Sequence, residues 1–278
     1  MTRRDKDVSP AWAAPLAGWR RALQAAGRTP GTIATRTDHI ARASRALGGS
    51  PWAVTAGELV DWVGGQEWAR DTRRSTYASL RAFWRWGQDM GYVTELPTRL
   101  LPAVKPSPPM PRPTPERVYR STLAAADDRL AVILRLAAEM GLRRAEIAQV
   151  HQRDLVEDLA GWSLVVHGKG ERDRMVPVPA GLAVELRARF LAAPGWLLPG
   201  DDQGHLSPRY VGILAARALP DGWTLHTLRH RFATAAYGVE RDLLSVQQLL
   251  GHVSVATTQR YVRPPDDALR RAVAHAAA

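Results

Sequence analysis

Apolar residues recur every three or four positions over most of the chain, and glycines and prolines interrupt this helical period at short intervals. In the first hundred residues the period predicts helices near 10–26, 30–47, 55–68 and 71–90. The last of these carries an apolar stripe that should face inward, made of Tyr77, Leu80, Phe83, Trp84 and Met90. The pattern therefore predicts a small, all-helical N-terminal domain.

A proline-rich stretch follows the fourth predicted helix. Prolines occupy seven of residues 101–115, which is too many for a helix or a central strand and is typical of an extended, semi-rigid connector. We therefore expect an N-terminal helical domain in residues 1–101, a linker in 102–115 and a C-terminal domain in 116–278.

The C-terminal part mixes two periods. Residues 117–140 read as two helices, and the alternating segments 162–166 and 174–178 read as the strands of a β-hairpin with a glycine-rich tip. The helical period then returns near 179–192, 207–217, 226–237, 242–250, 255–261 and 266–276. The predicted fold class is mainly α: an all-helical N-terminal domain and a mixed α/β C-terminal domain in which helices surround a small antiparallel sheet.

Charge and composition narrow the function. The chain has no cysteine, which excludes disulfides and thiolate metal sites, and it begins with no apolar run of signal-peptide or membrane-spanning length, so we expect a cytoplasmic protein. Of the net charge of +11, the first 115 residues hold +8, from 17 Lys and Arg against 9 Asp and Glu. Such an excess favours a nucleic acid partner, although charge alone fits a solubilising surface equally well.

Four arginines in the fourth predicted helix fall largely outside its apolar stripe: Arg73, Arg74, Arg81 and Arg85. A basic helix face suits the major groove or the phosphate backbone of DNA. Taken alone, such a face is more often a solvated surface. The motifs of the C-terminal domain make DNA contact the preferred interpretation.

Those motifs are short stretches in a fixed order: Gly141-Leu142-Arg143, Gly168-Lys169-Gly170, His226-Thr227-Leu228-Arg229, and Leu250-Gly251-His252 followed by Tyr261. Together they supply cations and one hydroxyl nucleophile. Such a set can cleave a phosphodiester without a metal, because the cations neutralise the charge that builds on the phosphate oxygens as the phenolate attacks. Each motif is weak by itself, since a lone arginine at a turn is usually a surface ion-pair partner and a lone tyrosine usually belongs to a core.

In this order, over residues 114–265, the motifs resemble those of the tyrosine recombinases, also called the phage integrase family. The resemblance implies that Arg143 and Arg229 clamp the scissile phosphate, that Lys169 is the general acid and that Tyr261 is the nucleophile. It further implies that His226 and His252 contact the phosphate, with His226 also sharing the proton of the nucleophile.

The resemblance to the family also bears on three positions outside the catalytic set. The resemblance implies that Glu146 orients Arg143 and that His230 is a structural histidine. The family more often has proline where this chain has Leu225, a departure that concerns the start of a helix more than the chemistry. The N-terminal region is too short for an extra arm-binding domain, so we expect the compact form of the family.

The resemblance implies a site-specific DNA recombinase that works through a 3′-phosphotyrosine and a Holliday junction, as four protomers on two double-stranded DNA sites, without metal, ATP or other cofactor. A directionality factor is left open, and so is the choice between a phage or mobile-element integrase and a chromosome-dimer resolving recombinase. We expect the apolar stripe after Pro264-Pro265 to pack on a neighbouring protomer, and the protein to associate with the nucleoid and not with a membrane. A type IB topoisomerase and a catalytically silent DNA-binding protein remain alternatives.

Overall fold

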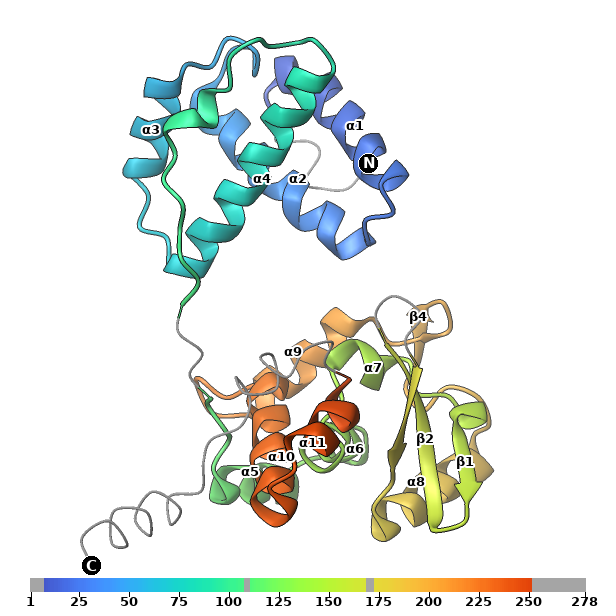
Figure 1. The fold of residues 1–278 in the computed structure, drawn as a ribbon. Helices are drawn as coiled ribbons and strands as arrows, with labels where there is room; N and C mark the ends of the chain where they lie inside the picture. The colour runs from blue at the N-terminus through green and yellow to red at the C-terminus, as the bar shows by residue number, and fades with distance from the viewer. Residues whose placement is uncertain (1–7, 108–110, 169–172, 252–278) are drawn as a thin grey trace, which may run out of the picture. The chain divides into compact units, whose positions relative to one another are not determined.

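The computed structural model describes residues 8–107, 111–168 and 173–251, which fall into two compact units, one within residues 1–108 and one within 109–278 (Figure 1). The described part of the N-terminal unit is helical: α1 (Pro10–Ala25), α2 (Pro30–Leu47), α3 (Ala56–Gly64), α4 (Arg70–Asp89) and the short 3-10 helix η2 (Pro97–Leu100). The predicted helices are therefore present. The third ends at Gly64 and not at residue 68, because two successive glycines favour the helix poorly.

An aromatic cluster forms the core of the N-terminal unit. The rings of Trp12, Trp19 and Trp52 lie around Phe83 with centroid distances of 5.4–5.9 Å. Buried Trp84 donates its indole N–H to the Pro51 carbonyl at 3.0 Å, so its polar atom is satisfied. Of the predicted stripe on α4, the residues from Tyr77 to Trp84 are buried. The inward placement of Met90 was wrong, because α4 ends before it and its side chain is 53% exposed.

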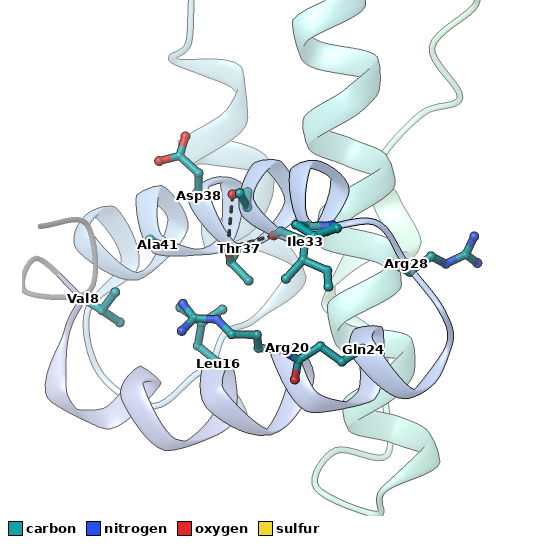
Figure 2. A pocket seen from close by; sticks show the side chains of 11 residues that line it. Val8, Leu16, Arg20, Gln24, Arg28, Ile33, Thr37, Asp38 and Ala41 are labelled. Carbon is teal, nitrogen blue, oxygen red and sulfur yellow. Dashed lines mark hydrogen bonds between the residues drawn. The ribbon is translucent and has the colours of Figure 1, made fainter. Parts of the chain in front are cut away.

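A groove of about 400 Å³ lies between α1 and α2 of this unit (Figure 2). Its lining mixes apolar side chains such as Leu16 and Ile33 with Arg20 and Arg28. Thr37 lies in the groove and donates its hydroxyl hydrogen bond to the carbonyl of Ile33 at 2.8 Å. The groove thus holds none of the residues that the sequence motifs single out.

The described ends of the proline-rich stretch are each held by their own unit. In the N-terminal unit Arg81 donates to the carbonyls of Leu101 and Pro102 at 2.8 and 3.0 Å. In the C-terminal unit the buried hydroxyl of Thr114 donates to that of Thr227 at 2.8 Å. The stretch is therefore tied to folded structure at both described ends.

The described part of the C-terminal unit combines helices with short strands. In chain order they are α5 (Glu116–Ala124), α6 (Asp128–Glu139), α7 (Arg144–Ala148), the 3-10 helix η3 (Gln152–Asp154), β1 (Leu155–Asp158), β2 (Gly161–His167), β3 (Asp173–Pro177), α8 (Ala180–Ala192), β4 (Pro199–Asp202), α9 (Pro208–Ala218), α10 (Leu225–Glu240) and α11 (Leu243–Leu250). The mainly α class with a small antiparallel sheet is confirmed. The helices predicted near 255–261 and 266–276 lie outside the described residues.

The described residues form a sheet in the order β1-β2-β3, with both pairs antiparallel. The predicted hairpin pairs Leu164 with Val176 and His167 with Asp173. The third strand, β1, was not predicted, because it spans only four residues and two of them are exposed acids. On β2, Leu164 and Val166 are buried in the core.

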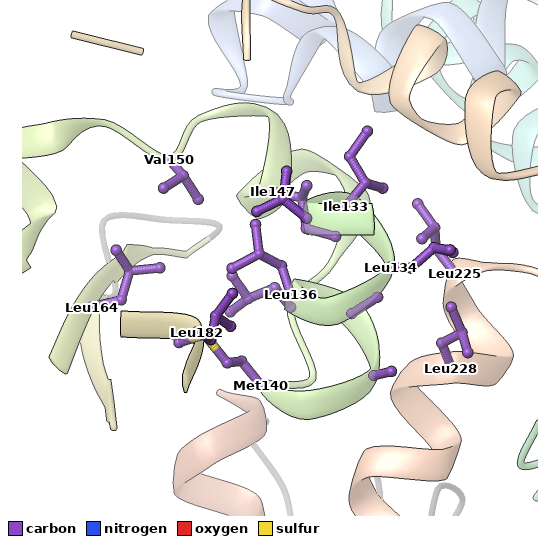
Figure 3. Close-up of a cluster of buried hydrophobic side chains, with 14 of the residues drawn as sticks. Ile133, Leu134, Leu136, Met140, Ile147, Val150, Leu164, Leu182, Leu225 and Leu228 are labelled. Carbon is purple, nitrogen blue, oxygen red and sulfur yellow. The ribbon is translucent and has the colours of Figure 1, made fainter. Parts of the chain in front are cut away.

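Helix α6 lies at the centre of the C-terminal unit's core (Figure 3). Several side chains of α6, and that of Met140 directly after it, are completely buried and pack among Leu164, Leu182 and Leu228. Because α6 packs against α10, α9 and α7, the turn at its C-terminal end is held in place by its neighbours. That turn carries Arg143.

Candidate active site

The turn between α6 and α7 requires glycine. Gly141 has a φ of +66°, and a Cβ atom there would lie 2.4 Å from a ring carbon of Phe232. Both the backbone conformation and the close approach exclude other residues. The turn buries Leu142 and brings Arg143 to the position just before α7.

Glu146 holds Arg143 from within the first turn of α7. One carboxylate oxygen accepts from the Arg143 Nη1 at 2.7 Å, and the other accepts from the Arg143 backbone N–H at 2.8 Å. The Glu146 side chain is only 4% exposed, whereas that of Arg143 is 40% exposed. The carboxylate thus fixes one edge of a guanidinium that remains partly exposed.

Arg229, from the second turn of α10, reaches the same carboxylate from the other side. Its side chain is 1% exposed, and its Nη1 lies 3.7 Å from Glu146. It donates to the carbonyl of Gly141 and, at 2.5 Å, to that of Leu250. Two guanidinium groups far apart in the sequence therefore meet at one buried carboxylate.

His226 lies one helical turn before Arg229 and is exposed. Helix α10 begins at Leu225, with Thr224 and Thr227 forming a capping box that takes the place of the expected proline. Partial desolvation and then the charges of Arg229 and Arg143 lower the pKa of His226. The imidazole is consequently neutral at neutral pH and able to accept a proton.

His230 follows on the same helix and is 7% exposed. Its ring lies 4.7 Å from that of His226, and its Nδ1 accepts the backbone N–H of Arg112 at 3.2 Å. Burial, reinforced by the charges of His226 and Arg229, lowers its pKa to about 4. His230 is thus a buried neutral ring that fixes the backbone at residue 112.

A groove of about 670 Å³ runs beside these residues. Its basic lining residues are Arg143, Arg144, Arg209, His226 and Arg229, and no carboxylate lines it among the residues that the structure describes. Sequence reasoning missed Arg144 and Arg209, since neither belongs to a recognisable motif. The groove is suited to an extended anion.

A further arginine that sequence reasoning missed is Arg174 on β3. Its guanidinium donates to both carboxylate oxygens of Glu146, at 3.0 and 2.9 Å, and its Nε donates to the Leu249 carbonyl at 2.7 Å. In the sequence it looks like an ordinary outward residue of a hairpin strand. Only the fold shows that its side chain is 90% buried, with a relative exposure of 10%.

Three of the expected catalytic residues lie outside the described residues: Lys169, His252 and Tyr261. Lys169 belongs to the connection between β2 and β3, and His252 directly follows Gly251, which caps α11. The structure thus brings Arg143, Glu146, His226 and Arg229 together.

The basic face expected on α4 divides into two kinds of side chain. Arg74 and Arg85 are exposed. Arg73 is half-buried and donates to the Gln66 carbonyl at 3.0 Å, and Arg81 holds the segment after η2. Two of the four arginines thus have structural partners, and two are fully available at the surface.

None of the helices in the described ranges is long and apolar enough to cross a membrane. The same ranges, with their gaps, contain no group of three or more His, Cys, Asp or Glu side chains placed to hold a metal ion.

Comparison with known proteins gives a consistent result. The sequence profile of the phage integrase family matches residues 114–267. The chain is 34% identical over 234 residues to tyrosine recombinase XerC of Methylobacterium sp. (strain 4-46), covering 76% of this chain and 71% of that protein. It is also 34% identical over 222 residues to XerC of Rhodospirillum centenum, covering 68% of this chain and 61% of that one.

The fold is similar to that of solved integrases. A lambda integrase tetramer bound to a Holliday junction matches with a TM-score of 0.75 and 19% identity, over 95% of this chain and 82% of that one. At this identity the likeness concerns the fold alone.

Proposed function

Because the chain belongs to the phage integrase family of tyrosine recombinases, we propose that it cleaves and rejoins DNA at specific sites through a 3′-phosphotyrosine on Tyr261. It is an enzyme, a site-specific DNA strand transferase. The observation that carries the proposal is the meeting of Arg143 and Arg229 at Glu146, beside His226, on a groove whose described lining has no carboxylate.

The two arginines bind the scissile phosphate. As the phenolate attacks, negative charge builds on the non-bridging oxygens, and preorganised guanidinium groups stabilise it more in the transition state than in the ground state. Arg229 is held rigidly by two carbonyls, and Arg143 presents its exposed edge to the groove. His252 adds a further contact to the phosphate.

Proton transfers accompany both changes of bonding at phosphorus. The bond from the Tyr261 oxygen to phosphorus forms while neutral His226 accepts the phenol proton. The bond from phosphorus to the 5′ oxygen breaks while Lys169 gives that oxygen a proton. The phosphotyrosine conserves the bond energy, so rejoining requires neither ATP nor a metal.

The DNA backbone lies along the groove. Arg144 and Arg209 are exposed and line it, and they contact the phosphates that flank the scissile one. The N-terminal domain, residues 1–101, is a core-binding domain whose α4 arginines Arg74 and Arg85 contact DNA, and residues 102–115 link it to the catalytic domain in 116–278.

Four protomers assemble on two double-stranded sites and exchange strands through a Holliday junction, each with its C-terminal tail on a neighbour. Deletion after Arg263 should therefore abolish assembly and recombination. The protein acts in the cytoplasm, associated with the nucleoid.

The test compares the wild-type protein with Tyr261→Phe in cells of the source organism, with Tyr210→Phe as the matched control because Tyr210 is partly exposed and does not line the groove. Cells are lysed in detergent and protein-linked DNA is isolated and sequenced. We expect adducts at one or a few loci with wild type and Tyr210→Phe and none with Tyr261→Phe. Scattered adducts would favour a topoisomerase, and an equal background in all three would favour a catalytically silent DNA-binding protein.

A further inference from the structure

Arg174 connects three parts of the catalytic unit through one side chain. It lies on β3, directly after the connection that carries Lys169, and its guanidinium bonds both to Glu146 on α7 and to the end of α11. It does not line the groove. A buried arginine with this set of bonds cannot contact a phosphate in the groove, so any part it takes in the reaction passes through its protein partners.

The Glu146 carboxylate is shared equally between two arginines. Each of its oxygens accepts one bond from Arg143 and one from Arg174, at distances of 2.7–3.0 Å. Burial alone would raise the pKa of Glu146, but the bonds and charges of Arg174 and Arg143 outweigh it and hold the pKa below its ordinary value. Without Arg174, the carboxylate would lose two of these four bonds and could rotate with the Arg143 guanidinium.

The end of α11 is a second place where acceptor groups are shared among arginines. The last two carbonyls of α11 lie at the negative end of the helix dipole, and each accepts one guanidinium: Leu249 accepts Arg174 at 2.7 Å and Leu250 accepts Arg229 at 2.5 Å. The carbonyl of Gly251, which caps the helix, accepts Arg143 at 3.4 Å. A Cβ atom at Gly251 would lie 2.9 Å from the Arg174 Nη1, so the backbone packs directly on this side chain. His252 is the next residue in the chain.

We propose that Arg174 is a positioning residue for phosphate activation: it clamps Glu146 and the end of α11 together so that Arg143 and Arg229 face the scissile phosphate in one fixed geometry. This inference rests on the proposed function. Planar bidentate pairing suits this task, because it fixes both the distance and the orientation of the carboxylate.

The test measures single-turnover cleavage at saturating protein, on a duplex that carries a site recovered from the wild-type adducts. Arg174→Gln should cleave about 10²-fold more slowly than wild type, because small misplacements of catalytic groups cost about this much. Its affinity for the duplex should change less than about 3-fold, since the residue does not touch DNA. Arg187→Gln is the matched control, an exposed arginine of the same unit that stacks on Trp162.

A second substrate separates positioning of the phosphate from positioning of the general acid. When sulfur replaces the bridging 5′ oxygen, the leaving group needs no proton, because a thiol has a pKa of about 8.5. Lys169→Ala should regain cleavage on this duplex, whereas Arg174→Gln should stay about 10²-fold slow. Recovery of Arg174→Gln to the wild-type rate would overturn the proposal, because it would place the effect on Lys169.

A double-mutant cycle with Glu146→Gln tests whether Arg174 acts through the Glu146 carboxylate. If Arg174 acts through Glu146, adding Arg174→Gln to Glu146→Gln should slow cleavage less than about 5-fold further, far below the effect of the single change. Full additivity of the two effects on the cleavage rate would overturn the proposal.

A second variant guards against loss of folding. If Arg174→Gln lowers the unfolding midpoint so far that the protein is not folded, Arg174→Lys replaces it in the assay. The same loss of cleavage rate is expected, because an ammonium group cannot pair bidentately with a carboxylate. Absence of adducts with wild type would instead reject the proposed function, and wild-type cleavage by Arg174→Gln would reject this inference alone.

Discussion

In the part of the chain that the structure describes, the cores of the two units differ in whether they contain arginine at their centre. In the N-terminal unit a neutral aromatic cluster around Phe83 forms the core, and Arg74 and Arg85 remain at the surface. In the C-terminal unit Arg229 and Arg174 are nine-tenths buried or more, among a carboxylate and helix-end carbonyls. We therefore expect the exposed guanidinium groups to provide affinity for a polyanion, and the buried, bonded ones to provide fixed geometry for a reaction.

Replacement of either arginine that we propose to bind the scissile phosphate should have the largest effect. Arg229→Gln and Arg143→Gln should each lower adduct formation by about 10²–10³-fold, the usual cost of removing a donor to a developing oxyanion. Arg229→Gln should also cost about 3 kcal/mol of unfolding free energy, because the buried carbonyls of Gly141 and Leu250 lose a donor. Arg143→Gln should cost at most about 1 kcal/mol, because its side chain is partly exposed.

Urea unfolding and a cleavage assay together check this pair. Equal losses of unfolding free energy in the two variants would contradict the distinction between a buried, structural guanidinium and an exposed one.

A smaller effect is expected on α4. The double variant Arg74→Gln, Arg85→Gln should weaken DNA binding and reduce the slope of log affinity against log salt by about 2, or about 0.9 for each lost phosphate contact. Cleavage at saturating protein should not change. Arg28→Gln, an exposed arginine that lines the groove between α1 and α2, is the control. A salt slope altered by Arg28→Gln but not by the α4 variant would place the DNA interface elsewhere on the unit.

The smallest effect concerns the base of the β2–β3 hairpin. His167 bonds to Asp154 at 3.1 Å and to Asp173 at 3.0 Å, and these carboxylates, Asp154 first, raise the pKa of His167. A raised pKa means that the ion pairs stabilise the fold fully below the unfolded pKa near 6.5, and that this contribution disappears as pH rises through the folded value.

The side chain of His167 is 44% exposed, so screening limits the contribution to at most about 1 kcal/mol. Thermal melts of wild type and His167→Gln should therefore differ at pH 5.5 and converge at pH 8.5. A difference that persists or grows at pH 8.5 would contradict the assignment.

The sequence predicts most helices of both units, because prolines and glycines mark their ends. The helix predicted at 30–47 is observed as Pro30–Leu47, where Thr29 caps its start. β1 escapes prediction because it is short and polar, and it exists only because β2 offers it a partner. The local sequence pattern thus predicts helices whose ends are marked by nearby residues, and it misses a strand that forms only by pairing with another strand.

The candidate site divides in the same way. The motifs point to Arg143, His226 and Arg229, because their residue types and order carry chemistry. Arg174 could not be found, since its partners Glu146 and Leu249 are distant in the sequence. The structural bond of Arg81 depends equally on a chain turn that brings Leu101 back to α4. The sequence therefore does not reveal which distant residues a long side chain will contact in the fold.

In the proposed reaction Tyr261 becomes covalently joined to DNA. The adduct formed with a cleaved site should be digested with nuclease and trypsin, and the DNA-linked peptide identified by mass spectrometry. Trypsin cuts after Arg260, and Pro264 protects the bond after Arg263, so the account predicts a peptide of residues 261–270 with a nucleotide on Tyr261. A nucleotide on any other residue, or a peptide of 261–270 that is always unmodified in an otherwise active protein, would contradict it.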